Sequence, residues 1–171
     1  MKKVVIALFV LSFSGIVTSC KREHHAFPYE LRAYFPYVIN QELAFVNDSD
    51  QSLSGRISYM RTSETQYLPY TCKCGSGYDS QMDVIIAADN MELSAIMSTT
   101  NSSFIISLAY QSVGKTIVLE KEYNGDPFSG HFSETLGDTV TLSKGNDRMV
   151  VIKGKGIAEI KAGDDVWHLK D

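Results

Sequence analysis

The sequence predicts an all-β fold, with one antiparallel domain of about nine or ten short strands between residues 27 and 171. Apolar and polar residues alternate over most segments from residue 41 onward, as they do in strands with one buried face. Short clusters of Gly, Asn, Asp and Ser separate these segments, and such clusters form tight turns. No window carries the period of an amphipathic helix.

The first two predicted strands span Gln41–Asn47 and Leu53–Met60. Because strand side chains point to alternate sides, each segment gathers its larger apolar side chains on one face. That apolar face carries Leu43, Phe45, Leu53, Ile57 and Tyr59. The opposite face carries Glu42, Ala44, Ser54, Arg56 and Ser58.

Eight further strands are predicted in two groups. The middle group comprises Met82–Ala88, Glu92–Ser98, Ser103–Tyr110 and Thr116–Tyr123. The C-terminal group reads as an antiparallel meander of Asp138–Ser143, Met149–Lys153, Ile157–Lys161 and Val166–Lys170. In the last strand Trp167 and Leu169 share the face that we assign to the core, and His168 points away from it.

The segment Phe27–Tyr37 leaves a choice between a helical turn and a strand. Pro28 and Pro36 bracket it and its aromatic residues favour a strand, so we predict no helix. Strand number does not separate a sandwich from a barrel. We expect a β-sandwich, because the turns are unevenly spaced and the region around Cys72 interrupts the middle. A closed or partly open lipocalin-like β-barrel is the alternative.

The N-terminus reads as an export signal. Met1-Lys2-Lys3 is basic, Val4–Val17 is almost continuously apolar, and small residues precede Cys20. This arrangement resembles a bacterial lipoprotein signal, which implies cleavage before Cys20 and lipidation of Cys20 with diacylglycerol and an acyl chain such as palmitate. We therefore expect a signal peptide at 1–19, a lipidated tether at 20–26 and the all-β domain at 27–171.

Lipidation of Cys20 predicts attachment to the outer membrane, either in the periplasm or at the cell surface. Several buried acyl chains hold a protein on a membrane where one chain does not. No other apolar run approaches the length of a membrane span. The formal net charge falls from −4 to −6 on maturation, because the signal carries Lys2 and Lys3. An acidic domain gains nothing from phosphates, so nucleic acid is excluded as a partner.

The cysteines Cys72 and Cys74 form the most unusual local feature, Cys-Lys-Cys-Gly-Ser-Gly. They are compatible with two structural thiols, with a strained and easily reduced disulfide, or with half of a metal site. We expect no metal, because no second pair of cysteines supplies the remaining ligands.

The tyrosines Tyr67, Tyr70 and Tyr78 flank this cysteine segment on a predicted loop. Exposed aromatic rings stack on sugars or anchor protein interfaces, so these three are our candidate ligand-binding residues. No spacing of residues indicates a catalytic motif. We therefore expect a non-enzymatic binding or structural component of the cell envelope, with a glycan or a protein as its partner and no cofactor beyond the lipid. The alternative is an envelope enzyme, either a hydrolase or a thiol-redox protein that uses Cys72 and Cys74.

Two stretches resemble small all-β lipoproteins of Bacteroides-type bacteria. The first is Tyr34-Phe35-Pro36-Tyr37 followed by Gln41-Glu42-Leu43, and the second is Lys153-Gly154-Lys155-Gly156-Ile157 with Trp167-His168-Leu169. The resemblance spans most of the mature chain. It implies an all-β envelope lipoprotein and supplies no active-site residue.

Overall fold

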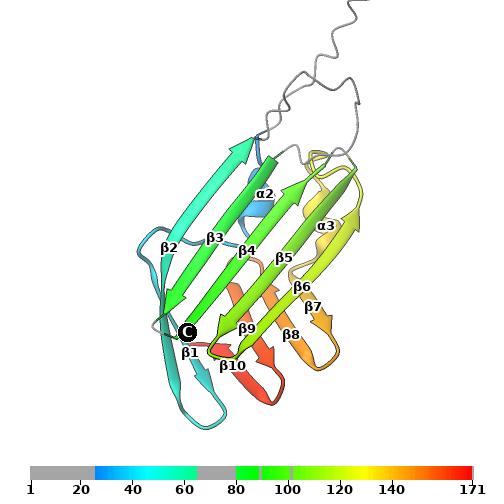
Figure 1. The fold of residues 1–171 in the computed structure, drawn as a ribbon. Helices are drawn as coiled ribbons and strands as arrows, with labels where there is room; N and C mark the ends of the chain where they lie inside the picture. The colour runs from blue at the N-terminus through cyan, green and yellow to red at the C-terminus, as the bar shows by residue number, and fades with distance from the viewer. Residues whose placement is uncertain (1–25, 65–79, 89, 101, 171) are drawn as a thin grey trace, which may run out of the picture.

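The computed structural model describes residues 26–64, 80–88, 90–100 and 102–170. Within these residues, ten strands form one antiparallel sheet that curves into a nearly closed barrel (Figure 1). They are β1 Glu42–Asn47, β2 Ser52–Glu64, β3 Ser80–Ala88, β4 Met91–Thr99, β5 Ser103–Ser112, β6 Lys115–Asn124, β7 Thr139–Lys144, β8 Asp147–Ile152, β9 Gly156–Ala162 and β10 Asp165–Leu169. The all-β prediction is confirmed.

The strand order shows how the chain closes on itself. The sheet runs β6-β5-β4-β3-β2-β1-β10-β9-β8-β7, so each half of the chain is a simple meander. The pairing of β1 with β10 joins the two halves, with Phe45 opposite Leu169. The strands β6 and β7 are the two edges of the sheet. The predicted C-terminal meander is confirmed.

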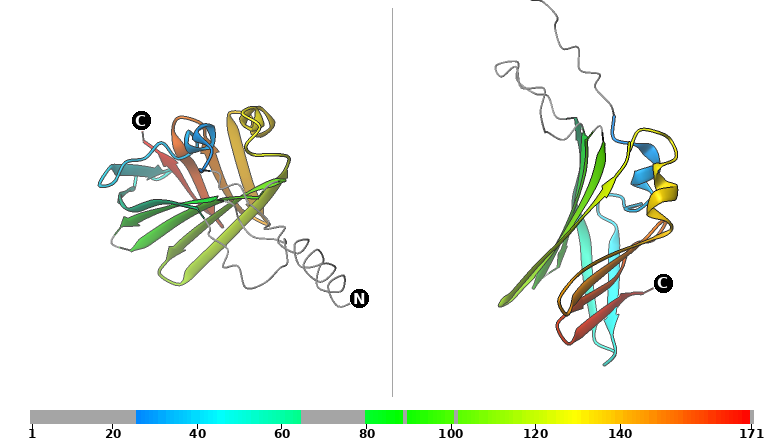
Figure 2. Two further views of the ribbon diagram at one scale, coloured as in Figure 1. Left: turned by 90° about the horizontal axis from the view of Figure 1, so that it is seen from above. Right: turned by 90° about the vertical axis from the view of Figure 1, so that its right-hand side faces the viewer.

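The expected sandwich is wrong, because the described strands form one continuous sheet and not two packed sheets. The structure is nearer to the barrel that we held as the alternative. Uneven turn spacing does not distinguish the two architectures here, because a long connection such as the one between β6 and β7 lies at one end of a single curved sheet (Figure 2).

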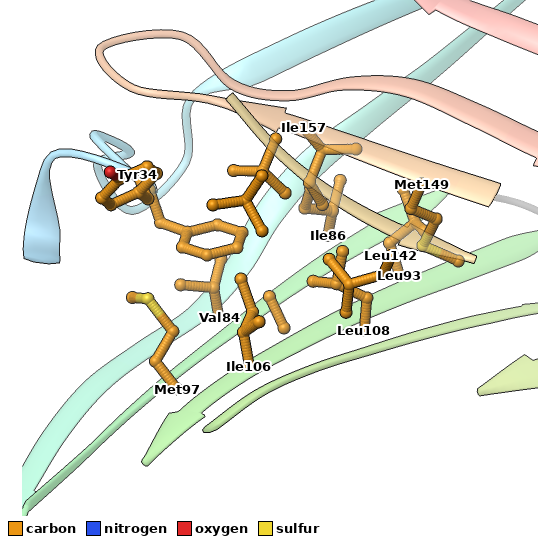
Figure 3. Packing of buried hydrophobic residues seen from close by; sticks show 14 of the residues in the cluster. Tyr34, Val84, Ile86, Leu93, Met97, Ile106, Leu108, Leu142, Met149 and Ile157 are labelled. Atoms are coloured by element: carbon orange, nitrogen blue, oxygen red, sulfur yellow. The ribbon is translucent and has the colours of Figure 1, made fainter. Parts of the chain in front are cut away.

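The interior of the barrel is filled by aliphatic side chains together with aromatic rings and methionines. Alternate residues of β3–β5 point toward alternate residues of β7–β9 and meet them across the barrel (Figure 3). Trp167 and Leu169 are half-buried and pack against this core, whereas His168 is exposed on the outside. The side chains assigned to β10 from the sequence are therefore placed as predicted.

Two short helices lie at one end of the barrel (Figure 2), α2 at Tyr29–Arg32 and α3 at Phe132–Leu136. The prediction that no helix forms is wrong. A helix of a single turn is too short to show a 3.6-residue period, and Pro28 is tolerated just before the first turn because its missing N–H is not needed there.

Two tyrosines tie this helical end to the barrel. The Tyr34 hydroxyl donates to the Gly137 carbonyl at 2.5 Å. The Tyr37 hydroxyl accepts from the Ile157 backbone N–H at 2.6 Å. Both side chains are buried, so these hydrogen bonds satisfy polar groups that have little access to water.

A β-bulge in β2 changes which face of the sheet the side chains in the second half of the strand point to. The pairing with β3 shifts between Ile57 and Tyr59, and Ser58 is the extra residue. One inserted residue moves all later side chains to the other face. Met60 therefore faces the core and Tyr59 faces outward, which corrects the placement of Tyr59 on the apolar face of Leu53 and Ile57.

Candidate binding surface

The site residues predicted from the sequence lie outside the described residues. This holds for the lipidation residue, for the cysteine pair and for the tyrosines of the predicted loop, namely Cys20, Cys72, Cys74, Tyr67, Tyr70 and Tyr78. They remain predictions. The candidate surface described below comes from other residues.

The outer face of β2–β6 carries a continuous set of apolar side chains. Tyr59 lies beside Ile85 across the β2–β3 pair, and Ala109 lies beside Val118 across the β5–β6 pair. Outward-facing isoleucines of β4 and β5 extend the set along the strands. We call these six residues the outer patch: Tyr59, Ile85, Ile96, Ile105, Ala109 and Val118.

The outer patch is open to solvent. Tyr59 and Ile96 are each 39% exposed and Val118 is 54% exposed, whereas Ile85, Ile105 and Ala109 are half-buried between their neighbours. The helices α2 and α3 and the strands β7–β10 all lie on the opposite side of this wall (Figure 2). Grouped apolar side chains on one face mark an interaction surface more often than single exposed ones do.

Charged side chains border the outer patch on both sides. One row across the sheet reads Arg61, Asp83, Ile96, Ser107 and Glu120, from β2 to β6. Glu122 lies two residues further along β6 and faces the same way. Within the described residues, neither Arg61 nor Glu120 forms an ion pair. The wall therefore has Arg61 at its β2 margin, Glu120 and Glu122 at its β6 margin, and the carboxylates Asp83 and Glu92 between them.

The opposite wall of the barrel carries half-buried valines, Val150 and Val166, beside a group of paired charges. Arg148 on β8 contacts the Glu159 Oε1 atom on β9 through Nε at 2.7 Å and through Nη2 at 2.5 Å. The His168 Nδ1 atom on β10 lies 4.0 Å from the Glu159 Oε2 atom. These groups already have partners in the folded chain, unlike Arg61 and Glu120.

Buried hydroxyl groups collect where β3, β4 and β5 meet at the helical end. The Ser80 and Thr99 hydroxyl oxygens are 2.8 Å apart, and those of Thr100 and Ser103 are 3.0 Å apart. Thr100 Oγ1 also accepts the Ser103 backbone N–H at 2.9 Å. Each of these hydroxyls is bonded to a neighbour, which stabilises the strand ends.

Two buried tyrosines, Tyr34 and Tyr37, have raised pKa values. Burial raises the pKa of Tyr37 to about 12, although the hydrogen bond from Ile157 opposes this shift. Burial also raises the pKa of Tyr34 to about 12, with smaller contributions from Asp138, Tyr123 and Glu30. Such phenols stay neutral and act as structural hydrogen-bonding groups. Among the described residues, no group of three His, Cys, Asp or Glu side chains is placed to hold a metal ion.

No family model, no curated protein and no solved structure matches this chain.

The sequence contains a pattern that indicates the outer patch, but an analysis based only on strict apolar–polar alternation does not detect it. The described strands contain adjacent aliphatic pairs, Ile85-Ile86, Ile105-Ile106 and Ile117-Val118. In a strand, one member of such a pair faces the core and the other faces outward. Tyr59 had no comparable signal, because its outward position depends on the bulge at Ser58.

Proposed function

We propose that this chain is a lipid-anchored, non-catalytic component of the cell envelope that binds a protein through the outer patch. The observation that carries the proposal is the group of exposed apolar side chains on the outer face of β2–β6, with Ile96 at its centre and Val118 at one margin. Aliphatic side chains bordered by charges match the apolar core and polar rim of protein interfaces.

The membrane part of the proposal rests on the sequence around Cys20. Lipidation at Cys20 keeps the domain next to the bilayer through the short segment that precedes Phe27. The outer membrane is the proposed location, as the lipoprotein resemblance implies.

The anchor predicts a simple fractionation result. The full chain with Cys20→Ala should move from the membrane fraction to the soluble fraction, because it has lost the site of its acyl chains. The chain with Cys74→Ser is a matched control, since it removes a thiol but leaves the lipidation site. Equal membrane retention of both variants contradicts the anchor.

The binding surface is tested with paired aspartate substitutions. Ile96→Asp/Val118→Asp alters the outer patch, whereas Ile39→Asp/Val113→Asp makes the same changes at exposed turn residues, Val113 being 86% exposed. Intact cells are cross-linked and the chain is purified with its covalently attached proteins. We expect the patch variant to lose its cross-linked partner and the control variant to keep it. Identical partners for the two variants would remove the outer patch from the proposal.

The glycan and thiol-redox alternatives depend on Tyr67, Tyr70 and Tyr78 and on Cys72 and Cys74, respectively. A protein partner is favoured over a glycan because the outer patch has one aromatic ring and five aliphatic side chains, and stacking on sugars needs aromatic rings. Alkylation of the native chain distinguishes the redox alternative, which requires reactive or reversibly oxidised thiols.

A further inference from the structure

We infer that the partner at the outer patch is a second copy of this chain. The two copies face each other across a two-fold axis that runs parallel to strand β4. The inference rests on the proposed function and names its partner. Three features of the described residues carry it: the order of side chains across β2–β6, the end of the barrel at which the described chain begins, and the size of the wall.

Two neighbouring rows of side chains across the wall, those of Tyr59 and Arg61, are self-complementary. A two-fold axis along β4 places β2 of one copy over β6 of the other, and β3 over β5. In the row that contains Tyr59, this brings Tyr59 onto Val118 and Ile85 onto Ala109. All four are apolar, so the contact removes apolar surface from water on both copies.

The charged row follows the same symmetry. Arg61 on β2 comes over Glu120 on β6, and Ile96 meets Ile96 on the axis. Both charges therefore find partners in the second copy that they lack within the described residues.

The described chain begins at Ala26, at the end of the barrel where α2 lies (Figure 2). An axis parallel to the strands leaves the two copies pointing the same way, so the first described residues of both copies lie at the same end of the dimer. Two copies anchored in one membrane can then associate. An axis across the strands would place the first described residues of the two copies at opposite ends of the dimer, so only one copy would have this end next to a shared membrane.

The size of the wall fits a weak dimer. Five strands spaced ~4.8 Å apart and about 30 Å long present roughly 700 Å² on a flat projection. Standard interfaces bury ~800 Å² on each partner. A curved wall presents less than its projected area, so the contact is smaller than a standard interface, and the long side chains of Tyr59, Arg61 and Glu120 reach across the margins. Confinement to one membrane raises the effective concentration and compensates for a modest affinity.

A cysteine on the axis tests the geometry directly. Ser94 faces outward on β4, beside Ile85 and Ala109, and therefore meets its own copy in the dimer. The full chain with Ser94→Cys, produced in cells and run on a non-reducing gel, should give covalent dimers. Thr141→Cys, exposed on the outer side of β7, is the matched control, and the unsubstituted chain measures any background from its own cysteines. We expect roughly tenfold more dimer from Ser94→Cys than from Thr141→Cys. Equal yields, or none from Ser94→Cys, overturn the inference.

A charge exchange then tests the pairing. On the Ser94→Cys background, Arg61→Glu and Glu120→Arg should each abolish the covalent homodimer, because each change opposes like charges. Copies of the two variants produced together should form a covalent heterodimer, since opposite charges then meet at both margins, one pair with its sign reversed and one as in the unsubstituted chain. Failure of the mixture to form this heterodimer contradicts the two-fold arrangement.

The two proposals fail in different ways. If the outer patch captures a different envelope protein, and Ser94→Cys gives no dimer, the binding function stands and the second copy is wrong. If the paired aspartate substitutions leave all cross-linked partners unchanged and Ser94→Cys also gives no dimer, both proposals fall.

Discussion

The contact between Tyr37 and Gly156 shows how single residues hold the helical end on the barrel. The Tyr37 hydroxyl lies against Gly156, so closely that a side-chain carbon at residue 156 would collide with it. Gly156 also has a φ of +89°, a conformation that residues with a side chain rarely adopt. The absence of a side chain at residue 156 thus lets Tyr37 reach the Ile157 N–H.

Gly156→Ala should therefore destabilise the protein by about 2–4 kcal/mol, through backbone strain and loss of the hydrogen bond to Tyr37. Gly154→Ala is the matched control, because Gly154 has a φ of +83° but open space where a side chain would stand. It should cost only about 1 kcal/mol, from the strain alone. Chemical denaturation measures both. Equal costs would show that the collision with Tyr37 does not matter.

The raised pKa of Tyr37 predicts a loss of stability in alkali. The phenol ionises near pH 10 in the unfolded chain and at about 12 in the folded chain, so folding favours the neutral form. Its contribution is fully present below pH 10 and disappears as the pH rises through 12. The wild-type free energy of unfolding should drop by about 2–3 kcal/mol on this account.

The Tyr37→Phe variant has no such proton to lose, so its free energy of unfolding should fall less steeply between pH 10 and 12. The decline that remains in this variant should come from the ionisation of Tyr34. At neutral pH the variant should already be less stable by about 1–3 kcal/mol, because the buried Ile157 N–H loses its acceptor. Urea titrations at pH 8, 10 and 11 compare the two proteins. Parallel pH profiles would exclude Tyr37 as a source of the alkaline loss.

At the scale of elements, the sequence predicts what depends on local alternation. The strand segments of the middle and C-terminal groups lie within a few residues of β3–β10, because each has one face buried in the barrel. What it misses depends on contacts between distant residues. The helix α2 forms where Leu31 can be buried and where Tyr34 reaches Gly137, a contact across 103 positions of the chain.

The bulge in β2 is another feature that depends on contacts with a different strand and not on local alternation. Nothing in the run Ile57-Ser58-Tyr59-Met60 shows which residue will be the extra one, because Tyr59 and Met60 are both apolar. The choice is made by β3, where Val84 faces the core opposite Met60 and Ile85 faces outward opposite Tyr59. Local alternation therefore assigns Tyr59 to the wrong face, and with it hides the outer patch.

Deletion of Ser58 should be far more damaging than its replacement. Without the extra residue, either the second half of β2 turns over, which takes Met60 out of the core, or its pairing with β3 shifts. Loss of a fully buried methionine costs about 2–5 kcal/mol, and the half-buried Met60 should contribute toward the lower end of that range. Ser58→Ala keeps the residue and removes only a hydrogen bond of 3.3 Å from the exposed hydroxyl to the Ile85 carbonyl, so it should change stability by less than about 0.5 kcal/mol. Thermal melts that show similar losses for both variants would contradict the role of the bulge.

At the scale of the whole molecule, the barrel has two walls with different character. The wall of β2–β6 carries the outer patch, and the wall of β7–β10 carries the paired charges around Glu159. Each half of the chain builds one wall as a meander, and β1 with β10 joins them. In the proposed arrangement, the wall of β2–β6 takes part in association and the wall of β7–β10 stays in solvent.

The open seam between β6 and β7 is the remaining feature of the whole barrel. An edge strand offers unpaired N–H and C=O groups to other chains, and charged side chains discourage that pairing. The strand β6 carries Lys115, Glu120, Lys121 and Glu122, whereas the interior strand β4 carries Glu92 alone. The charged side chains of β6 disfavour pairing of this edge strand with the sheet of another molecule. The proposed dimer therefore uses the outer face of β2–β6 and not the edge of the sheet.

Amide hydrogen exchange reports whether the seam stays open in solution. In β4, which has a neighbour on each side, nearly every backbone N–H should be protected. In β6, paired only with β5, every second N–H points away from its neighbour and should exchange rapidly. In β7, paired only with β8, the same alternation is expected. Protection of consecutive amides along both β6 and β7 would show that these strands hydrogen-bond to each other and that the barrel is closed. Because dimerisation covers the face of β4 without pairing the edges, the alternation should persist at concentrations where the dimer forms.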